Sequence, residues 1–388
     1  MRIAIVYDCL FPVNTGGGER VYRRVAELLV ARGHSVDYLT RDQWGDGAVP
    51  RTNFAVVPVW TGEIADASGA RRMAAAVGFA RGVFRELRRR RGDYDLVIVS
   101  ALPVLNVFAA RVATFGRRTR MLSDWLEVWT WRKWREYSGA PVGTVAWVLQ
   151  WLALRLTSDV TVNSSFTRAR VLRHRRGLDP IVLGLLDLAG KPAELDSDRS
   201  ERADVEPGLV LFAGRHIPDK QLTALPAAVA VAHAEDPSVH AVVVGSGPET
   251  EALRRAIAEE GAGRLFDIRG RVDDDELERL FAEAAVLVNP SRREGFGLVV
   301  AEAAALGTPS VVVAGDDNAA ADLIKQGVNG FVAADAGPAA LGGAIVDAMR
   351  GGAELRRSTA DWFASASRTQ NLSHSVDEIL RRYRSSAR

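Results

Sequence analysis

Two glutamates and a glycine-rich turn in one short stretch of the sequence have the residue types needed to hold a phosphorylated ligand. Glu294 precedes Gly295-Phe296-Gly297, and Glu302 follows with seven residues between the two carboxylates. We predict a helix from about Leu298 to Leu306, because Gly307-Thr308-Pro309 would end it. The first N–H groups of a helix lack internal partners and its dipole favours negative charge, so this helix start suits an anion. A carboxylate one turn inside the helix, as at Glu302, suits neutral hydroxyls instead. Together these features indicate a phosphate flanked by two polyols, which is the chemistry of a nucleotide sugar.

The segment 290–313 resembles the signature of the retaining glycosyltransferases of family 4, which have the GT-B fold. That signature is a Glu, Gly-Phe-Gly, a second Glu eight positions after the first, and a Gly-Thr-Pro stop, and this chain has all of it. The resemblance implies that Glu294 contacts hydroxyls of the donor sugar and that Glu302 contacts the ribose. It also implies that backbone N–H groups face phosphate or sugar at Phe296, Gly297, Leu298 and Val299. A surface loop ahead of an Ala-rich packing helix is the alternative.

A second candidate site follows a predicted strand at 209–213. Gly214-Arg215 and then Lys220, five residues after the arginine, match the family's diphosphate-binding pair. A departing nucleoside diphosphate gains charge in the transition state, and cations already in place stabilise that charge. An arginine can bind two oxygens at once, whereas a lysine acts as a compact point charge. A solvated surface pair is the alternative, and the surrounding sequence favours the binding role.

Glycines also mark three other loops. Gly17 and Gly18 belong to the sequence NTGGGER, where the backbone can approach a ligand closely, and the resemblance implies that they lie near the donor phosphates and the acceptor. A flexible loop without a ligand is the alternative. The turn 245–249 has a Gly-x-Gly-Pro-Glu sequence that is mostly structural in the family. The backbone near Val272 meets the nucleobase in the family, which leaves the choice of base open.

The catalytic candidates are Glu294, Arg215, Lys220 and Asp124. Many relatives carry a histidine in the first domain near the reacting carbon, whereas the segment 121–127 of this chain reads MLSDWLE. We predict that Asp124 orients the acceptor or acts as a base, with Ser123 and Glu127 as alternatives. In the family's retaining reaction the leaving phosphate itself can take the acceptor's proton.

We expect neither a metal nor a cofactor. The nucleotide-diphosphate sugar would be the donor substrate. Asp93-Tyr94-Asp95 has the D-x-D form of some metal-dependent transferases, but it leads directly into a buried strand. Asp273-Asp274-Asp275 is typical of a helix N-cap. The sequence has no Cys/His cluster with the spacing of metal ligands.

Alternating strand and helix patterns predict an α/β protein with the GT-B architecture, two Rossmann-like doubly wound domains facing an interdomain cleft. A chain of 388 residues is too long for one ordinary core. We predict an N-terminal, acceptor-side domain at 1–190, a polar linker at 190–208 and a donor-binding domain at 205–361. By resemblance, a last helix at about 362–388 crosses back onto the first domain. Strands are predicted at 2–7, 35–40, 96–100, 160–163, 209–213, 240–244, 265–269 and 286–289. Helices are predicted at 19–32, 165–175, 222–234, 249–260 and 275–284.

Charge divides the chain into a basic half and an acidic half. Residues 1–190 hold 28 Lys and Arg against 17 Asp and Glu, a net charge of +11, and residues 191–388 hold 22 against 31, a net charge of −9. The first half is therefore expected to meet something anionic, such as a membrane surface or an anionic acceptor. Nucleic acid is not expected, because no recognised binding module accompanies the charge. A single cysteine, Cys9, and a strand-like start instead of a secretory leader predict a cytoplasmic protein, with peripheral contact at the inner face of the membrane as the variant.

Six of the nine tryptophans lie between residues 125 and 151, interleaved with Arg132, Lys133 and Arg135. Tryptophan stacks on sugar rings, and beside basic residues it also suits a membrane interface. The uncharged segment 137–154 is either a membrane-contacting helix or an ordinary buried helix, and the sequence favours the second. The basic run 81–91 is either solvated or faces anionic headgroups.

The resemblance implies retaining, metal-independent transfer of a sugar from a nucleotide-diphosphate donor to a hydroxyl of a glycan, a lipid-linked molecule or a small molecule. Two alternatives stay open. One is a non-catalytic nucleotide- or glycan-binding protein on the same scaffold, and the other is a GT-B sugar-nucleotide epimerase. An NAD-dependent enzyme is disfavoured because no complete dinucleotide fingerprint is present.

Overall fold

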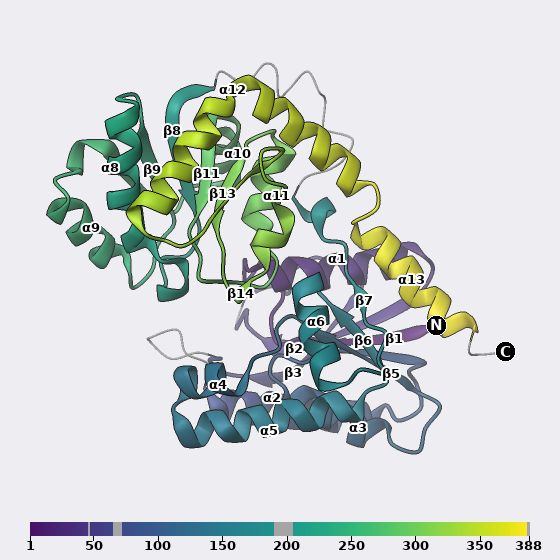
Figure 1. Ribbon diagram of the computed structural model, residues 1–388. Coiled ribbons are helices and arrows are strands. Elements are labelled where there is room, and N and C mark those ends of the chain that lie inside the picture. The colour runs from purple at the N-terminus through teal and green to yellow at the C-terminus, as the bar shows by residue number, and fades with distance from the viewer. Residues whose placement is uncertain (46, 65–71, 190–204, 386–388) are drawn as a thin grey trace. The chain divides into compact units, whose positions relative to one another are not determined.

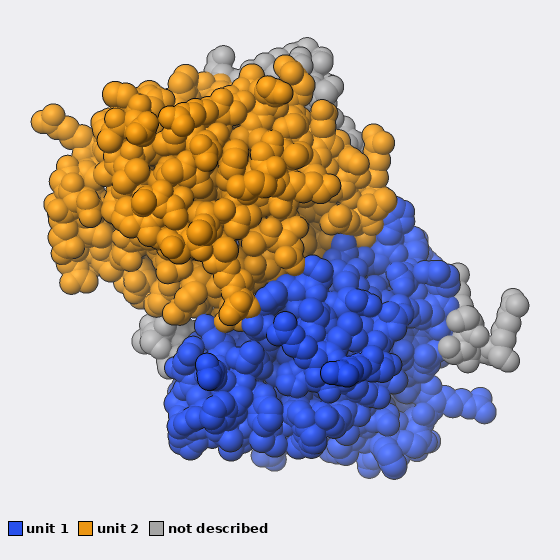
Figure 2. Space-filling model, in the orientation of Figure 1, with its two compact units in different colours: residues 1–184, 372–388 blue, residues 185–371 orange. Residues whose placement is uncertain are grey.

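The computed structural model describes residues 1–45, 47–64, 72–189 and 205–385. The chain divides into two compact units (Figures 1 and 2): unit 1 comprises residues 1–184 and 372–388, and unit 2 comprises residues 185–371. Each unit contains a large parallel sheet packed against helices, so the predicted α/β class with two Rossmann-like domains is confirmed. Most of the predicted linker, 190–204, lies outside the described residues.

The sheet of unit 1 has the strand order β3-β2-β1-β4-β5-β6-β7, and all its pairings are parallel. The strands are β1 (Arg2–Val6), β2 (Ser35–Asp42), β3 (Ala55–Thr61), β4 (Leu96–Ser100), β5 (Arg120–Trp125), β6 (Asp159–Val162) and β7 (Ile181–Val182). The chain order reverses at β1, which lies between β2 and β4. Ligands of open α/β sheets bind at the carboxyl end of such a reversal, and the glycine-rich loop follows β1 there.

The helices of unit 1 come from several parts of the chain. They are α1 (Gly17–Ala31), α2 (Met73–Arg89), α3 (Leu105–Thr114), α4 (Trp131–Ser138), α5 (Ala140–Leu156), α6 (Ser165–His174) and α13 (Leu372–Ser385). They pack on this sheet, except for α4, which packs against α5. One buried cluster joins α2, α3 and α5 to the strands through residues such as Phe79, Val83, Val107 and Leu154.

The last helix begins later than predicted. The predicted helix at about 362–388 is in fact the end of α12 (Pro338–Ser367) followed by α13. Trp362 and Phe363 pack against the core of unit 2, which keeps this part of α12 in that unit. Helix α13 packs against α1 and β7 of unit 1, where Arg32 bonds Asp377 at 2.5 Å and Ser373 Oγ at 2.9 Å.

Unit 2 has a sheet in the order β10-β9-β8-β11-β13-β15 and a two-stranded sheet of β12 and β14, all parallel. The strands are β8 (Glu206–Ala213), β9 (His240–Val244), β10 (Phe266–Gly270), β11 (Ala284–Asn289), β12 (Arg293–Glu294), β13 (Ser310–Val313), β14 (Asp317–Asn318) and β15 (Gly330–Ala333). The α-helices, besides α12, are α8 (Leu225–Glu235), α9 (Thr250–Glu259), α10 (Asp274–Glu283) and α11 (Leu298–Ala305). Short 3₁₀ helices are η1 (Leu186–Leu188), η2 (Pro218–Lys220), η3 (Leu222–Ala224), η4 (Gly263–Leu265) and η5 (Ala319–Leu323).

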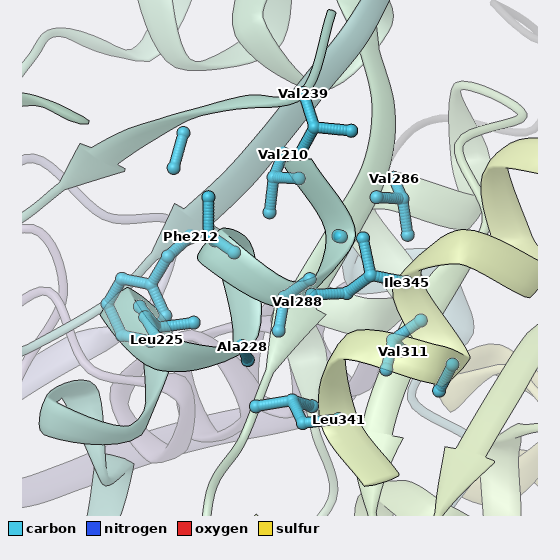
Figure 3. Close-up of a cluster of buried hydrophobic side chains, with 14 of the residues drawn as sticks. Val210, Phe212, Leu225, Ala228, Val239, Val286, Val288, Val311, Leu341 and Ile345 are labelled. Carbon is cyan, nitrogen blue, oxygen red and sulfur yellow. The ribbon is translucent and has the colours of Figure 1, made fainter. Parts of the chain in front are cut away.

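Successive residues of each strand face opposite sides of the unit 2 sheet, which explains its continuous apolar strands. In β8, Val210 and Phe212 join the cluster that contains Leu225 of α8 and Ile345 of α12 (Figure 3). Leu209 and Leu211, from the alternate positions, join a second cluster that contains residues of α10 and α11. A strand that is buried on both faces can have apolar residues at every position. The polar residues lie in the loops that follow the carboxyl ends of these strands.

Candidate functional site

The loops after β8 and β11 bring Lys220 and Glu294 together in unit 2. Lys220 Nζ donates a hydrogen bond to Glu294 Oε1, and the two side chains are only 15% and 14% exposed. The same oxygen accepts from Asn289 Nδ2 at 3.2 Å and from Ser291 Oγ at 3.1 Å. Among the described residues, no protein group donates to Glu294 Oε2. This arrangement leaves one carboxylate oxygen able to accept from a ligand hydroxyl.

Asp219 fastens these two loops to each other. Its carbonyl oxygen accepts from the Arg292 N–H at 2.9 Å, and its carboxylate pairs with Arg292 at 3.2 Å and with Arg293 at 3.6 Å. Lys220 is the next residue in the chain, so these contacts of Asp219 set the position of the Lys220 ammonium group beside Glu294. Asp219, Asn289 and Ser291 were not predicted as site residues from the sequence. The sequence Asn-Pro-Ser at 289–291, at a strand end, is the signal that could have indicated the last two.

Arg215 and His216 follow Gly214 at the carboxyl end of β8 and differ sharply in burial. Arg215 is exposed and has no ion-pair partner among the described residues, so its guanidinium group is available to an anion. His216 is fully buried, and its Nδ1 lies 2.8 Å from Thr250 Oγ1. Burial lowers the pKa of His216. The buried histidine anchors the loop that presents Arg215 and Lys220, a role that was not predicted from the sequence.

The glycine turn after β9 is hydrogen-bonded to the loop after β8. His216 donates its N–H to Ser246 O at 3.0 Å and accepts from the Glu249 N–H at 2.9 Å. A Cβ on Gly245 would lie 1.8 Å from Gly214 O, so only glycine allows this backbone contact. Gly245 in turn donates to Gly270 O at 2.6 Å, just before the half-buried Val272. These contacts agree with the structural role expected for the turn 245–249.

Helix α11 begins where the sequence predicts and is held by a close backbone contact. Its N-cap Gly297 has a φ of +96°, and a Cβ there would lie 2.7 Å from Ala320 Cβ. The first helical hydrogen bond to Gly297 O comes from Val300, so the N–H groups of 296–299 precede the bonded turns. Gly295 and Phe296 are half-buried beside this start, and Glu302 lies half-buried one turn inside the helix. The structure therefore places a helix N-terminus and Glu294 within one short segment.

In unit 1 the glycine loop rests on two stacked tyrosines. Helix α1 begins at the exposed Gly17, two residues earlier than predicted. A Cβ on Gly18 would lie 2.7 Å from the Tyr7 hydroxyl, and the Tyr7 and Tyr22 rings stack with centroids 4.2 Å apart. The Tyr22 hydroxyl donates to Asp124.

Asp124 is buried below this loop. Its Oδ2 accepts from Tyr22, and its Oδ1 accepts from Thr161 Oγ1 at 2.6 Å. Burial raises the pKa of Asp124 above its usual range, against the opposing effect of the two hydrogen bonds. Both oxygens are thus occupied by hydroxyl groups of the protein, which favours a positioning role under the glycine loop. Its predicted role toward an acceptor stays a prediction.

The tryptophans of 125–151 do not form one sugar-stacking surface. Trp125 is in the core, while Trp129 packs against Trp134 and Tyr137. Gln150 of α5 bonds the backbone of Trp129 and the Trp134 indole, at 2.8–3.1 Å. The expectation of an ordinary buried helix at 137–154 is wrong for one side of α5. Gly143, Gln150, Ala153 and Leu154 are buried, whereas Val142, Val145, Val148 and Leu152 are exposed. No described helix is long and apolar enough to span a bilayer.

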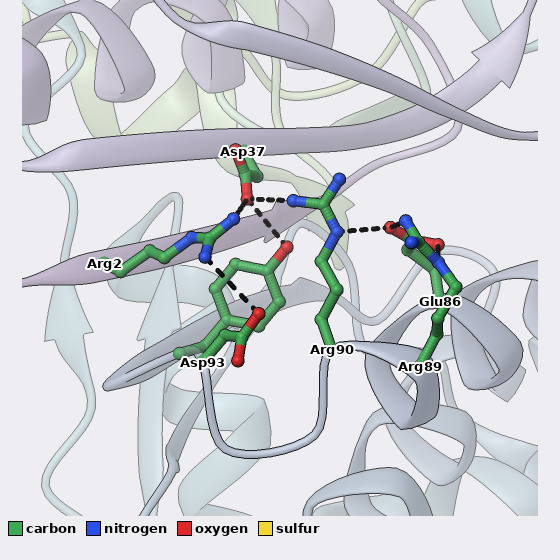
Figure 4. Close-up of polar contacts among 7 residues, drawn as sticks. Arg2, Asp37, Glu86, Arg89, Arg90 and Asp93 are labelled. Carbon is green, nitrogen blue, oxygen red and sulfur yellow. Dashed lines mark hydrogen bonds and ion pairs between the residues drawn. The ribbon is translucent and has the colours of Figure 1, made fainter.

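The D-x-D sequence belongs to a structural cluster at the amino ends of the unit 1 strands (Figure 4). Asp37, with a side chain 7% exposed, accepts from Arg2 at 3.0 Å, from Arg90 at 2.8 Å and from the Tyr94 hydroxyl at 2.8 Å. Asp93 pairs with Arg2 at 3.4 Å. Arg90 is therefore an ion-paired residue rather than a solvated part of the basic run 81–91.

Other acidic groups also have structural roles. Asp273 caps α10, as predicted, by accepting from the Glu276 N–H at 2.8 Å. Within the described ranges, no group of three or more His, Cys, Asp or Glu side chains could hold a metal ion.

Two family models match this chain. Residues 16–184 match the glycosyl transferase 4-like domain, and residues 194–361 match the glycosyl transferases group 1. The first match lies within unit 1 and the second within unit 2.

Curated relatives share sequence with part of the chain. The D-inositol 3-phosphate glycosyltransferase of Streptomyces griseus is 33% identical over 180 residues, which are 42% of this chain and 38% of that protein. The phosphatidyl-myo-inositol mannosyltransferase of Propionibacterium freudenreichii is 31% identical over 182 residues, 46% of this chain and 43% of that protein. The matched part thus spans about two-fifths of the length of these relatives.

Solved structures agree with the fold along nearly the whole chain. Sucrose-phosphate synthase from Thermosynechococcus elongatus superposes with a TM-score of 0.76 at 20% identity, covering 99% of this chain and 98% of that one. HepE of Anabaena, solved in complex with UDP and glucose, superposes with a TM-score of 0.69 at 18% identity, covering 99% and 100%. The family models and the fold agree with the signature at 290–313, and the chain belongs to the family 4 glycosyltransferases with the GT-B fold.

Proposed function

We propose that the protein is a retaining glycosyltransferase that moves a sugar from a nucleotide-diphosphate donor to a hydroxyl acceptor without a metal ion. The observation that carries this proposal is the cluster of Lys220, Glu294, Asn289 and Ser291 ahead of the N-terminus of α11. It combines a cation and free N–H groups for phosphate with a carboxylate for hydroxyls.

Donor binding would redistribute the contacts of this cluster. The diphosphate takes the Lys220 ammonium group and the helix N–H groups, with the exposed Arg215 as a second cation. Glu294 keeps its bonds to Asn289 and Ser291 and accepts from sugar hydroxyls through Oε2. Because the cations come from the protein, charge on the leaving diphosphate is stabilised without a metal.

Retention follows if departure and attack share one face of the sugar. The bond between the anomeric carbon and the diphosphate oxygen breaks, and the acceptor oxygen bonds to the same carbon. The departing diphosphate oxygen takes the acceptor's proton, so atoms and charge balance without a protein base. Asp124 then has no proton to accept, which is consistent with the hydrogen bonds that already occupy its two oxygens.

Transfer assays with UDP-, GDP-, ADP- and dTDP-sugars test the proposal, with EDTA present and absent. The named activities of the two relatives suggest inositol 3-phosphate and phosphatidylinositol as first acceptors. We expect EDTA-insensitive transfer from one donor, and the anomeric configuration of the product, assigned by NMR, should match that of the donor. Nucleotide binding without transfer would favour the binding-protein alternative, and an altered free sugar without an acceptor would favour the epimerase.

Lys220→Ala and Glu294→Ala should each reduce turnover by about 100-fold or more, since each removes a group that stabilises the transition state. Arg254→Ala is the matched control, because Arg254 is an exposed arginine of unit 2 whose partner is the exposed Glu251. Steady-state rates with the identified donor give the comparison, and circular dichroism checks folding. Wild-type rates in both site variants would refute the donor site.

A further inference from the structure

Helix α5 leaves an apolar face uncovered. Val142, Val145 and Val148 are 47%, 60% and 40% exposed, and Leu152 and Leu156 are 39% and 36% exposed. The spacing of three or four residues places these side chains along one side of the helix. No charged residue interrupts 140–154.

The inward side of α5 explains why the valines face out. A Cβ on Gly143 would lie 2.2 Å from Trp134 O, so α4 and α5 meet backbone to backbone at this point. Gln150, Ala153 and Leu154 are buried on the same inward side. The contacts of Gly143 and Gln150 thus fix the rotation of the helix, and Val142, Val145, Val148 and Leu152 remain outside.

Exposed apolar and basic residues continue onto α3 and α4, which both contact α5. Val112 and Phe115, in and just after α3, are 57% and 70% exposed, and Trp131 of α4 is 41% exposed. Exposed arginines accompany them at Arg111, Arg117, Arg118, Arg132 and Arg155. Residues 105–156 contain eight Lys and Arg against three Asp and Glu, and one of those acids, Asp124, is buried.

Arginine and tryptophan also pair directly beside this face. The Arg155 guanidinium carbon lies 3.5 Å from the centroid of Trp151, and that of Arg135 lies 4.3 Å from the centroid of Trp131. Such pairs present a flat amphipathic ring together with a cation. Amphipathic rings beside basic residues suit the boundary between acyl chains and anionic headgroups.

We propose that this face, formed by α3, α4 and α5, docks on an anionic lipid bilayer. The helix has 17 residues, about 25 Å in length, and lies in the plane of the membrane surface, with its valines and leucines in the acyl boundary. The exposed arginines in α3, just after α3 and in α4 bind the headgroup phosphates. A protein partner would need acidic groups to match this basic border, whereas an anionic bilayer supplies them at every position. Docking does not depend on the proposed transfer reaction, and the two can fail separately.

Flotation of the full chain with vesicles tests this proposal. We expect binding to vesicles of phosphatidylglycerol and phosphatidylcholine, weak binding to pure phosphatidylcholine, and a decrease with salt. The double variant Val145→Glu/Val148→Glu should weaken binding by about tenfold or more, because it puts charges into the acyl boundary. Arg117→Gln and Arg132→Gln should each weaken binding to the anionic vesicles alone, by about fivefold.

Val231→Glu on α8 is the matched control, since Val231 is an exposed valine of unit 2, 37% accessible. Val145→Ser/Leu152→Ser replaces the charged variant if that variant fails to fold. Unchanged flotation of the α5 variants, or no flotation of the wild type, overturns the proposal. A soluble dimer that the same variants dissociate also overturns it, because a second copy would then cover the face. Donor turnover with a water-soluble acceptor should stay at the wild-type rate in all these variants.

Discussion

The polar residues of the unit 2 site are held in place by partners that are far away in sequence. Lys220 and Glu294 are 74 residues apart, and neither side chain is more than 15% exposed. Removing one member of such a pair leaves the other charge poorly solvated, so a loss of activity is accompanied by some loss of stability. Asn289 and Ser291 lessen this effect for Glu294, because they keep its Oε1 hydrogen-bonded.

His216 should make the stability of the protein depend on pH. Its pKa is lowered by burial, so the unfolded chain takes up a proton first as the pH falls below about 6.5. The stability associated with neutral His216 is present above that pH and is lost as the pH falls through the lowered pKa. The free energy of unfolding, measured with urea, should therefore fall more between pH 7.5 and pH 5 in the wild type than in the His216→Gln variant. Equal losses in the two proteins would contradict the assignment.

At the scale of elements, backbone contacts between loops decide where the helix starts lie. The loops after β8, β9 and β10 are joined by hydrogen bonds from Gly214 to Val244 O, from His216 to Ser246 O and from Gly245 to Gly270 O. The start of α11 rests on Ala320 of η5, and Asn318 holds η5 by bonding Ser291 O and Val313 O. Glycine is needed where such backbones touch.

Gly297 and Gly92 form a matched pair for testing this contact. Their φ angles are +96° and +95°, but a Cβ on Gly297 would lie 2.7 Å from Ala320 Cβ, whereas a Cβ on Gly92 would meet nothing within 4 Å. In both alanine variants the free energy of unfolding should fall by about 1 kcal/mol, because alanine is strained in the left-handed backbone conformation. Gly297→Ala should lose about 1–3 kcal/mol more from overpacking and should also weaken donor binding. Urea unfolding and nucleotide titration measure these effects, and equal losses in the two variants would exclude the packing argument.

At the scale of the whole molecule, the chain passes twice between two units that have separate cores. Unit 1 is completed by α13, whose Leu372, Val376, Ile379 and Leu380 are buried. Eight of the nine tryptophans lie in unit 1, and only Trp362 lies in unit 2. Tryptophan fluorescence therefore reports chiefly on the unfolding of unit 1.

Ile379→Ala should lower the free energy of unfolding by about 2–4 kcal/mol, because it leaves a cavity beneath α13. The loss should appear in the fluorescence-detected transition. Leu341→Ala, at a fully buried position of α12 in unit 2, is the comparison, and it should act mainly on the far-ultraviolet circular dichroism transition. If both variants shift the two transitions equally, the two units unfold together. That result would contradict the expectation that α13 stabilises a core that unfolds separately.

The fold class, most of the regular elements around the site and the motif at 290–313 could be predicted from the amino-acid sequence. Strands at 96–100 and 240–244 have the predicted bounds, and the other predicted strands differ by three residues at most. These features depend on local spacing, such as continuous apolar runs, glycine stops and the start of α11. Local spacing is visible in one chain without knowledge of its contacts.

Which distant groups meet and which faces stay exposed became clear only from the folded chain. Three contacts join residues from separate βα units. They are the ion pair of Lys220 with Glu294, the ion pair of Asp219 with Arg292, and the hydrogen bond from Tyr22 to Asp124. Such contacts depend on strand order and register, which a single sequence does not encode locally. The exposed face of α5 is a similar case, because a helix that is apolar on all sides gives no sign of its rotation. The backbone contact at Gly143 fixes that rotation and thereby leaves the valines outside.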